Sequence, residues 1–97
     1  MFVRMTMAEI HMDKIDETIK VFEDYVVPMA KSQKGLREVY LLTDRKRGKG
    51  VAISFWDSEE DAIASEQNGY YQEQVNKFMR FFIASPTIEG YQVSVPS

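Results

Sequence analysis

The chain has 97 residues, a net charge of −3, one histidine and no cysteine. This composition excludes disulfides, thiolate chemistry and a metal site built from several histidines, and residues 51–97, with two Lys or Arg against seven Asp or Glu, argue against a broad nucleic-acid surface. One domain is expected over residues 1–97. No apolar run approaches the ~20 residues that span a bilayer, and no signal peptide is evident. We therefore expect a cytoplasmic protein outside the membrane.

The first third of the chain predicts a strand followed by a helix. Residues 1–10 alternate as in a strand whose apolar side carries Val3, Met5 and Met7. Asp13 is expected to cap the helix that follows. Apolar residues then recur every three or four positions, at Ile15, Ile19, Phe22, Val26 and Met29. This spacing predicts an amphipathic helix that Pro28 kinks or tightens near its end and that Gly35 stops.

Two further strands are predicted over residues 36–43 and 50–56. The polar linker between them contains glycine, which is typical of a hairpin. Its tip, Arg45 to Lys49, is basic. We interpret the tip as a solvated hairpin end, with a phosphate-binding patch as the alternative, and the sequence assigns it no role.

The stretch from Phe55 to Ala62 joins a strand to a helix. Ser58, with Asp61 three positions later, is typical of a helix N-cap. The helix is expected to reach about Gln67 and to break at Asn68–Gly69. A second helix is then predicted from the spacing of Tyr71, Val75, Phe78 and Phe82, and Pro86 closes it. A last strand is predicted from Tyr91, Val93 and Val95.

This order of elements predicts an α+β, ferredoxin-like βαββαβ fold, with a four-stranded antiparallel sheet and both helical segments on one face. Alternation places Trp56 toward the helices. The other face of the sheet then carries Val3, Met5, Met7, Val51, Ile53 and Phe55. Because a monomer rarely leaves such a patch in water, we expect a homodimer packed sheet to sheet.

An RNA-binding module is the competing interpretation of this topology. Residues 49–56 partly resemble the RNP1 strand of RNA-recognition motifs, and Phe2–Val3 part of the RNP2 strand. That module stacks bases on aromatic rings at positions that are Val51 and Ile53 in this chain. Aliphatic side chains cannot stack in this way, so no nucleic-acid partner is expected.

Three stretches resemble the antibiotic biosynthesis monooxygenase (ABM) domain family of the dimeric α/β-barrel superfamily. They are Val27–Pro28, residues 34–40, and residues 55–62 followed by residues 68–71. The resemblance covers nearly the whole chain and implies a dimer with a ligand cavity between helices and sheet in each subunit. It also implies one of three roles: oxidation of aromatic polyketides or quinols by dioxygen without a cofactor, haem degradation, or no known activity.

Two departures from the family pattern bear on function. The histidine that relatives often carry about ten residues after the tryptophan corresponds to Glu66. The asparagine, tryptophan and histidine of the haem-degrading branch correspond approximately to Thr6, Ser65 or Glu66, and Val75 or Asn76. Haem degradation is therefore disfavoured.

Cofactor-free oxygenation needs a base or hydrogen-bond partner, a pocket that excludes water, and orientation of the ring. The expected pocket residues are Arg4, Thr6, Phe22, Ser54, Trp56, Tyr71 and Phe78. Arg4 is the candidate for stabilising an anionic oxygen, and Thr6 or Tyr71 for donating a hydrogen bond. Core packing is the alternative for Trp56, Tyr71 and Phe78, and an acidic partner would make Arg4 structural. His11 is expected to be an exposed turn residue, with general base as the alternative.

We therefore predict a cofactor-independent monooxygenase that acts on an aromatic or quinol-type small molecule, without a metal, as a homodimer. The alternative is a non-catalytic dimeric module that binds a small molecule or another protein.

Overall fold

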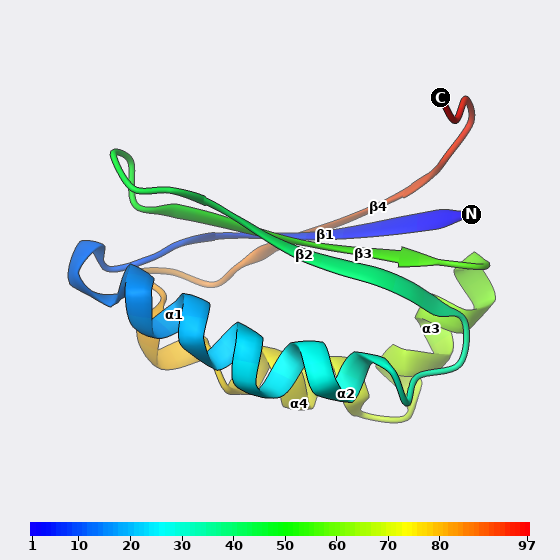
Figure 1. Cartoon of the computed structure of the whole chain (residues 1–97), viewed down its shortest axis with the longest axis horizontal. Helices are drawn as coiled ribbons and strands as arrows, with labels where there is room; N and C mark the ends of the chain where they lie inside the picture. The colour runs from blue at the N-terminus through cyan, green and yellow to red at the C-terminus, as the bar shows by residue number, and fades with distance from the viewer.

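Two layers make up the fold of the computed structural model, which describes residues 1–97 (Figure 1). One layer is an antiparallel sheet of β1 (Phe2–Glu9), β2 (Leu36–Asp44), β3 (Lys49–Trp56) and β4 (Thr87–Gln92), in the spatial order β2-β3-β1-β4. All the helices form the other layer, which packs against one face of the sheet. The ferredoxin-like fold predicted from the sequence is confirmed.

The helical layer comes from two parts of the chain. The first part consists of η1 (Met12–Lys14), α1 (Ile15–Val21), η2 (Phe22–Val26) and α2 (Val27–Ala30). The second consists of α3 (Glu59–Gln67), α4 (Tyr70–Asn76) and η3 (Met79–Phe81). None of these helices is long and apolar enough to cross a bilayer.

The start of the first helical part differs from the prediction. Asp13 lies inside η1 and caps no helix, so its predicted role was wrong. The chain enters the helix through a 3-10 turn, in which the backbone N–H of Lys14 donates to the carbonyl of His11 at 2.8 Å. A backbone group therefore satisfies the first turn in place of a side chain.

The same helix changes its winding in the middle. η2 is a π-helical segment, in which the N–H of Val27 donates to the carbonyl of Phe22. The wider turn rotates the buried face, so that Ala30 follows Val26 on it and Met29 is exposed. The predicted place of Met29 in the apolar stripe was therefore wrong. Pro28 explains the change, because it lacks an N–H and its ring crowds the carbonyl four residues earlier.

The joint between β3 and α3 is built as predicted. Ser58 caps α3 by accepting a hydrogen bond from the backbone N–H of Asp61 at 3.2 Å. Gly35, with φ of 80°, lies against this joint, and its carbonyl accepts from the N–H of Asp57 at 2.8 Å. A Cβ at Gly35 would come within 2.1 Å of the Asp61 carboxylate. Only glycine therefore fits where β2 begins.

The last strand begins earlier than predicted and ends sooner. β4 starts at Thr87, directly after Pro86, and ends at Gln92, so Val93 and Val95 lie outside it. Val93 is held by one backbone hydrogen bond to the carbonyl of Met1 at 2.9 Å. β4 pairs only with β1 and forms an edge of the sheet, with all six residues exposed.

The buried core has two clusters. The larger one joins the first helical part to the end of the second and contains Ile10, Ile15, Phe22, Val26, Phe78 and Phe81. The smaller one contains Phe2, Trp56 and Ala62 at the β3–α3 joint. Residues from both clusters line the cavity described below.

The opposite side of the sheet carries no helix (Figure 1). Antiparallel pairing sets Val3 opposite Phe55, Met5 opposite Ile53, and Met7 opposite Val51. We call these six residues the open face. Each is only partly buried in the single chain. Tyr40 of β2 extends the open face, with its ring 6.0 Å from that of Phe55 in an edge-on arrangement.

Candidate functional site

A cavity of about 100 Å³ lies between the helix-facing side of the sheet and the helices. Fifteen of its 21 lining residues are hydrophobic. The structure places all seven expected pocket residues around it: Arg4, Thr6, Phe22, Ser54, Trp56, Tyr71 and Phe78. β1, β2 and β3 supply the strand residues of the wall, and η2 and α4 contribute from the helical layer. The cavity therefore offers a small ligand a mostly apolar surface.

Trp56 lies at the end of β3 and is 1% exposed. Its indole Nε1 donates a hydrogen bond to Ser54 Oγ, two residues earlier, at 2.9 Å. The ring thus packs in the core while its one polar atom is satisfied within the same strand. This arrangement gives Trp56 a packing role at the cavity wall and leaves it no hydrogen to donate to a ligand.

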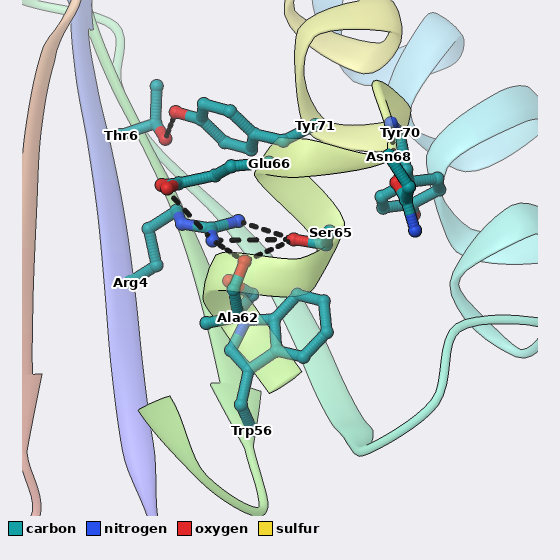
Figure 2. Close-up of polar contacts among 10 residues, drawn as sticks. Arg4, Thr6, Trp56, Ala62, Ser65, Glu66, Asn68, Tyr70 and Tyr71 are labelled. Carbon is teal, nitrogen blue, oxygen red and sulfur yellow. Dashed lines mark hydrogen bonds and ion pairs between the residues drawn. The ribbon is translucent and has the colours of Figure 1, made fainter. Parts of the chain in front are cut away.

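Arg4 extends from β1 toward α3, where its guanidinium is held by several partners (Figure 2). Nη2 donates to the carbonyl of Ala62 at 2.6 Å, and both terminal nitrogens lie 3.3 Å from Ser65 Oγ. Glu66 Oε1 lies 3.3 Å from Nη2 and supplies the counter-charge. The guanidinium also lies 4.3 Å from the centre of the Tyr71 ring, a cation–π contact.

These contacts define what Arg4 can do. Burial lowers the pKa of Arg4 from its ordinary value and the charge of Glu66 raises it, so the side chain stays charged at neutral pH. The charge of Arg4 is already paired with the carboxylate of Glu66. An acidic partner of this kind was expected to give Arg4 a structural role. Arg4 therefore anchors α3 to the sheet and contributes a partly neutralised positive charge next to Tyr71.

Thr6 of β1 and Tyr71 of α4 meet through their hydroxyl groups at 2.5 Å (Figure 2). Burial raises the pKa of Tyr71, while the Thr6 hydrogen bond and the charge of Arg4 act in the opposite direction. Burial likewise raises the pKa of the neighbouring Tyr70. Both phenols are therefore protonated at neutral pH. The Thr6–Tyr71 pair forms a polar point in the otherwise apolar cavity wall.

Gln74 is a cavity residue that the sequence analysis missed. It lies on α4 three positions after Tyr71, is 7% exposed, and neither polar atom of its side chain has a hydrogen-bond partner. An unpaired buried carboxamide costs about 1–3 kcal/mol. The signal for it was a polar residue on the apolar helix stripe, four positions before Phe78, but the spacing was assigned to Val75 instead.

Other singled-out residues lie away from the cavity. His11 is exposed and does not line it. At the hairpin tip, Arg45 pairs with Asp16 at 2.7 Å and Arg47 pairs with Asp44 at 2.6 Å. No group of three or more His, Asp or Glu side chains is arranged to hold a metal ion.

Comparisons with known proteins bear on the family and the fold of this chain. The family model described as antibiotic biosynthesis monooxygenase matches residues 1–77. No curated protein has a significantly similar sequence.

Solved structures show the same fold at low sequence identity. A protein from Bordetella bronchiseptica, provisionally named an antibiotic biosynthesis monooxygenase, has a TM-score of 0.82 and 11% identity over 97% of each chain. A protein from Nitrosomonas europaea with the same provisional name has a TM-score of 0.80 and 13% identity, covering 99% of this chain and 92% of the other. An antibiotic biosynthesis monooxygenase structure has a TM-score of 0.76 and 16% identity, covering 99% and 100%.

Proposed function

We propose that this chain, which belongs to the antibiotic biosynthesis monooxygenase family, is a cofactor-independent monooxygenase of a small phenol or quinol. The observation that carries the proposal is an apolar cavity of about 100 Å³ with a hydroxyl pair in its wall. A mostly apolar wall favours binding of a ring, and the hydroxyl pair can orient it. The volume of the cavity is comparable with the ~150 Å³ apolar cavities that accept benzene, which supports a single-ring substrate.

In the proposed reaction, dioxygen converts a ring C–H of the bound phenol into a quinone carbonyl. The C–H bond breaks, and the carbon becomes bonded to one atom of dioxygen. The second oxygen atom leaves as water with the ring hydrogen and the hydroxyl hydrogen. The electrons that reduce dioxygen all come from the substrate, so no external reductant is needed.

Tyr71 and Thr6 are the proposed hydrogen-bond partners of the substrate oxygen. The bond between them uses one of their two hydroxyl protons, so the second proton is left to donate to a ligand. Burial raises the pKa of Tyr71, which keeps its hydroxyl protonated. The charge of Arg4, although partly neutralised by Glu66, favours an anionic oxygen beside Tyr71.

The cavity wall contains no carboxylate and no imidazole. The proposed enzyme therefore has no general base against the substrate, and the substrate proton leaves to water. More acidic phenols are then the better substrates. The pH profile of kcat/KM is expected to follow the ionisation of the phenol used, and not that of a protein group.

Oxygen uptake with a panel of single-ring phenols and quinols tests the proposal, after subtraction of uptake in buffer alone. Tyr71→Phe removes a donor to the substrate oxygen and is expected to lower kcat by about 10²-fold. Tyr25→Phe is the matched control, because Tyr25 is exposed and lies outside the cavity. Uptake by the wild type that does not exceed the buffer rate for any member of the panel would refute the proposal.

A non-catalytic binding module is the second candidate. The observation that favours it is Glu66, which occupies the position where the family resemblance implied a histidine and is paired with Arg4. Melting temperatures that rise with phenols, without any oxygen uptake or product, would select this candidate over the enzyme.

We also propose that the protein is a homodimer in which two open faces pack together. The partly exposed apolar residues of the open face, extended by Tyr40, Leu42 and Tyr91, support a partner of the same shape. Ile53→Glu at the centre of the open face is expected to give a monomer in sedimentation at micromolar concentration. Ile63→Glu, on the exposed side of α3, is the control and leaves the dimer intact. A monomeric wild type would contradict this proposal.

A further inference from the structure

Gln74 is the only residue whose buried side-chain nitrogen or oxygen atoms have no hydrogen-bond partner. Two other polar side chains of the cavity wall have partners within the chain. Ser54 accepts from Trp56, and the Thr18 hydroxyl donates to the carbonyl of Lys14 at 2.8 Å. Buried polar groups are almost always paired in native proteins, so this exception requires an explanation.

Packing alone does not account for a carboxamide at this position. Most of the cavity wall is hydrophobic, and methionine or leucine has a similar size without the cost of an unpaired amide. The stability lost by placing glutamine there is therefore a disadvantage for the chain by itself. A group that binds in the cavity and pairs with the amide removes that disadvantage.

Tyr71 and Gln74 both line the cavity from α4, as does Tyr70. Gln74 follows Tyr71 by three residues on α4, so both side chains project from neighbouring points of the same helix face. Tyr71 meets Thr6 from the opposite layer, whereas Gln74 meets no protein group. A single ring with two oxygen substituents matches this pair of positions.

We propose that Gln74 is a ligand-binding residue whose carboxamide pairs with an oxygen substituent of a single-ring phenol or quinol in the cavity. This inference rests on the proposed function and names its specificity determinant. The carboxamide has both a donor and an acceptor. Its Oε1 accepts from the hydroxyl of a phenol, and its Nε2 donates to the carbonyl of a quinone, so the residue pairs with both substrate and product.

Ligand binding without dioxygen provides the test. Trp56 is the only tryptophan and lines the cavity, so its fluorescence reports occupancy. The wild type is expected to bind hydroquinone more tightly than phenol, and phenol more tightly than toluene. Gln74→Met is expected to weaken hydroquinone binding about 10- to 100-fold and to leave toluene binding unchanged, because only the oxygenated ring loses a partner.

Two further variants make the test specific. Gln72→Met introduces the same change at an exposed position of α4 and should bind all three rings like the wild type. Gln74→Leu repeats the test with a second apolar side chain. Without ligand, the Gln74 variants are expected to unfold at the same or a higher urea concentration than the wild type, since they remove an unpaired buried amide.

The inference and the proposed function fail in different ways. Equal hydroquinone affinity of the wild type and both Gln74 variants overturns the inference. So do Gln74 variants that are less stable than the wild type and bind normally, which would assign the residue a structural role. Wild-type binding that depends on Gln74 but gives no oxygen uptake overturns the proposed enzyme and supports the inference. Oxygen uptake whose KM is unchanged in Gln74→Met overturns the inference and supports the proposed enzyme.

Discussion

Replacing Glu66 by alanine would leave the guanidinium of Arg4 buried without its counter-charge. Arg4 has a side-chain exposure of only 5%, whereas that of Glu66 is 46%. Breaking a fully buried ion pair by removing one partner costs about 3–5 kcal/mol. Because water already screens Glu66, and because Ala62 and Ser65 still accept from Arg4, we expect a loss of about 2 kcal/mol.

The reverse substitution is expected to be milder, although it breaks the same ion pair. In Arg4→Met, Glu66 is half exposed and keeps its hydration, and Ser65 Oγ still donates to the carbonyl of Ala62 at 2.7 Å. No buried group is left unpaired, and the desolvation of the guanidinium is relieved, which offsets the lost contact with Tyr71. We expect a loss below about 1 kcal/mol. In the Arg4→Met background, Glu66→Ala should then change stability by less than about 0.5 kcal/mol.

Urea denaturation followed by circular dichroism measures these differences. Protein concentration must be the same throughout, because the stability of the proposed dimer would depend on it. In thermal melts the Glu66→Ala loss corresponds to a shift of roughly 8–16 °C for a chain of this length. Glu73→Ala, which breaks an exposed pair with Lys77, is the control and should cost less than about 0.5 kcal/mol. If Arg4→Met is more destabilising than Glu66→Ala, or if the two losses add in the double variant, Arg4 is not held as a buried charge.

Three further substitutions test the fold and the site. Gly35→Ala is expected to destabilise the chain more than Gly69→Ala in urea titrations. Both glycines have positive φ, but only a Cβ at position 35 would meet Asp61. Equal losses of stability would contradict this contact. Ser58→Ala should cost about 1 kcal/mol through loss of the α3 cap, with Ser58→Thr retaining most of the stability. Because burial raises the pKa of Tyr71 above that of an unfolded tyrosine, unfolding releases a proton at alkaline pH, and stability falls as pH rises above about 10. Tyr71→Phe should make this fall less steep, and an unchanged slope would show that folding does not raise the pKa of Tyr71.

The elements that could be predicted are those governed by neighbours along the chain. Ser58 caps α3 through an atom three residues away, and the faces of β1 and β3 follow from strict alternation. Pro28 was recognised as a disturbance of the helix. Its result, a π-helical turn that buries Ala30 in place of Met29, depends on how the whole helix packs against the sheet.

The site was only partly predictable. Alternation and helical spacing were enough to bring Arg4, Thr6 and Tyr71 to the cavity, because each lies on a face that the pattern assigns to the helix side. The role of Arg4 depends on its ion pair with Glu66, which is distant in the sequence. Gln74 was passed over, since a glutamine within an apolar stripe is ordinary until its surroundings show that no partner is near.

The sequence by itself determined the order of strands and helices, the ferredoxin-like topology and the two faces of the sheet, because periodicity and capping act over a few residues. The tertiary structure alone decided which polar groups in the interior are satisfied. Arg4 pairs with the carboxylate of Glu66 on α3, and Thr6 shares a hydrogen bond with the hydroxyl of Tyr71. The side chain of Gln74 has no hydrogen-bond partner. Hydrogen bonds and ion pairs of this kind join residues that only the folded chain brings together, and their geometry is absent from any local pattern.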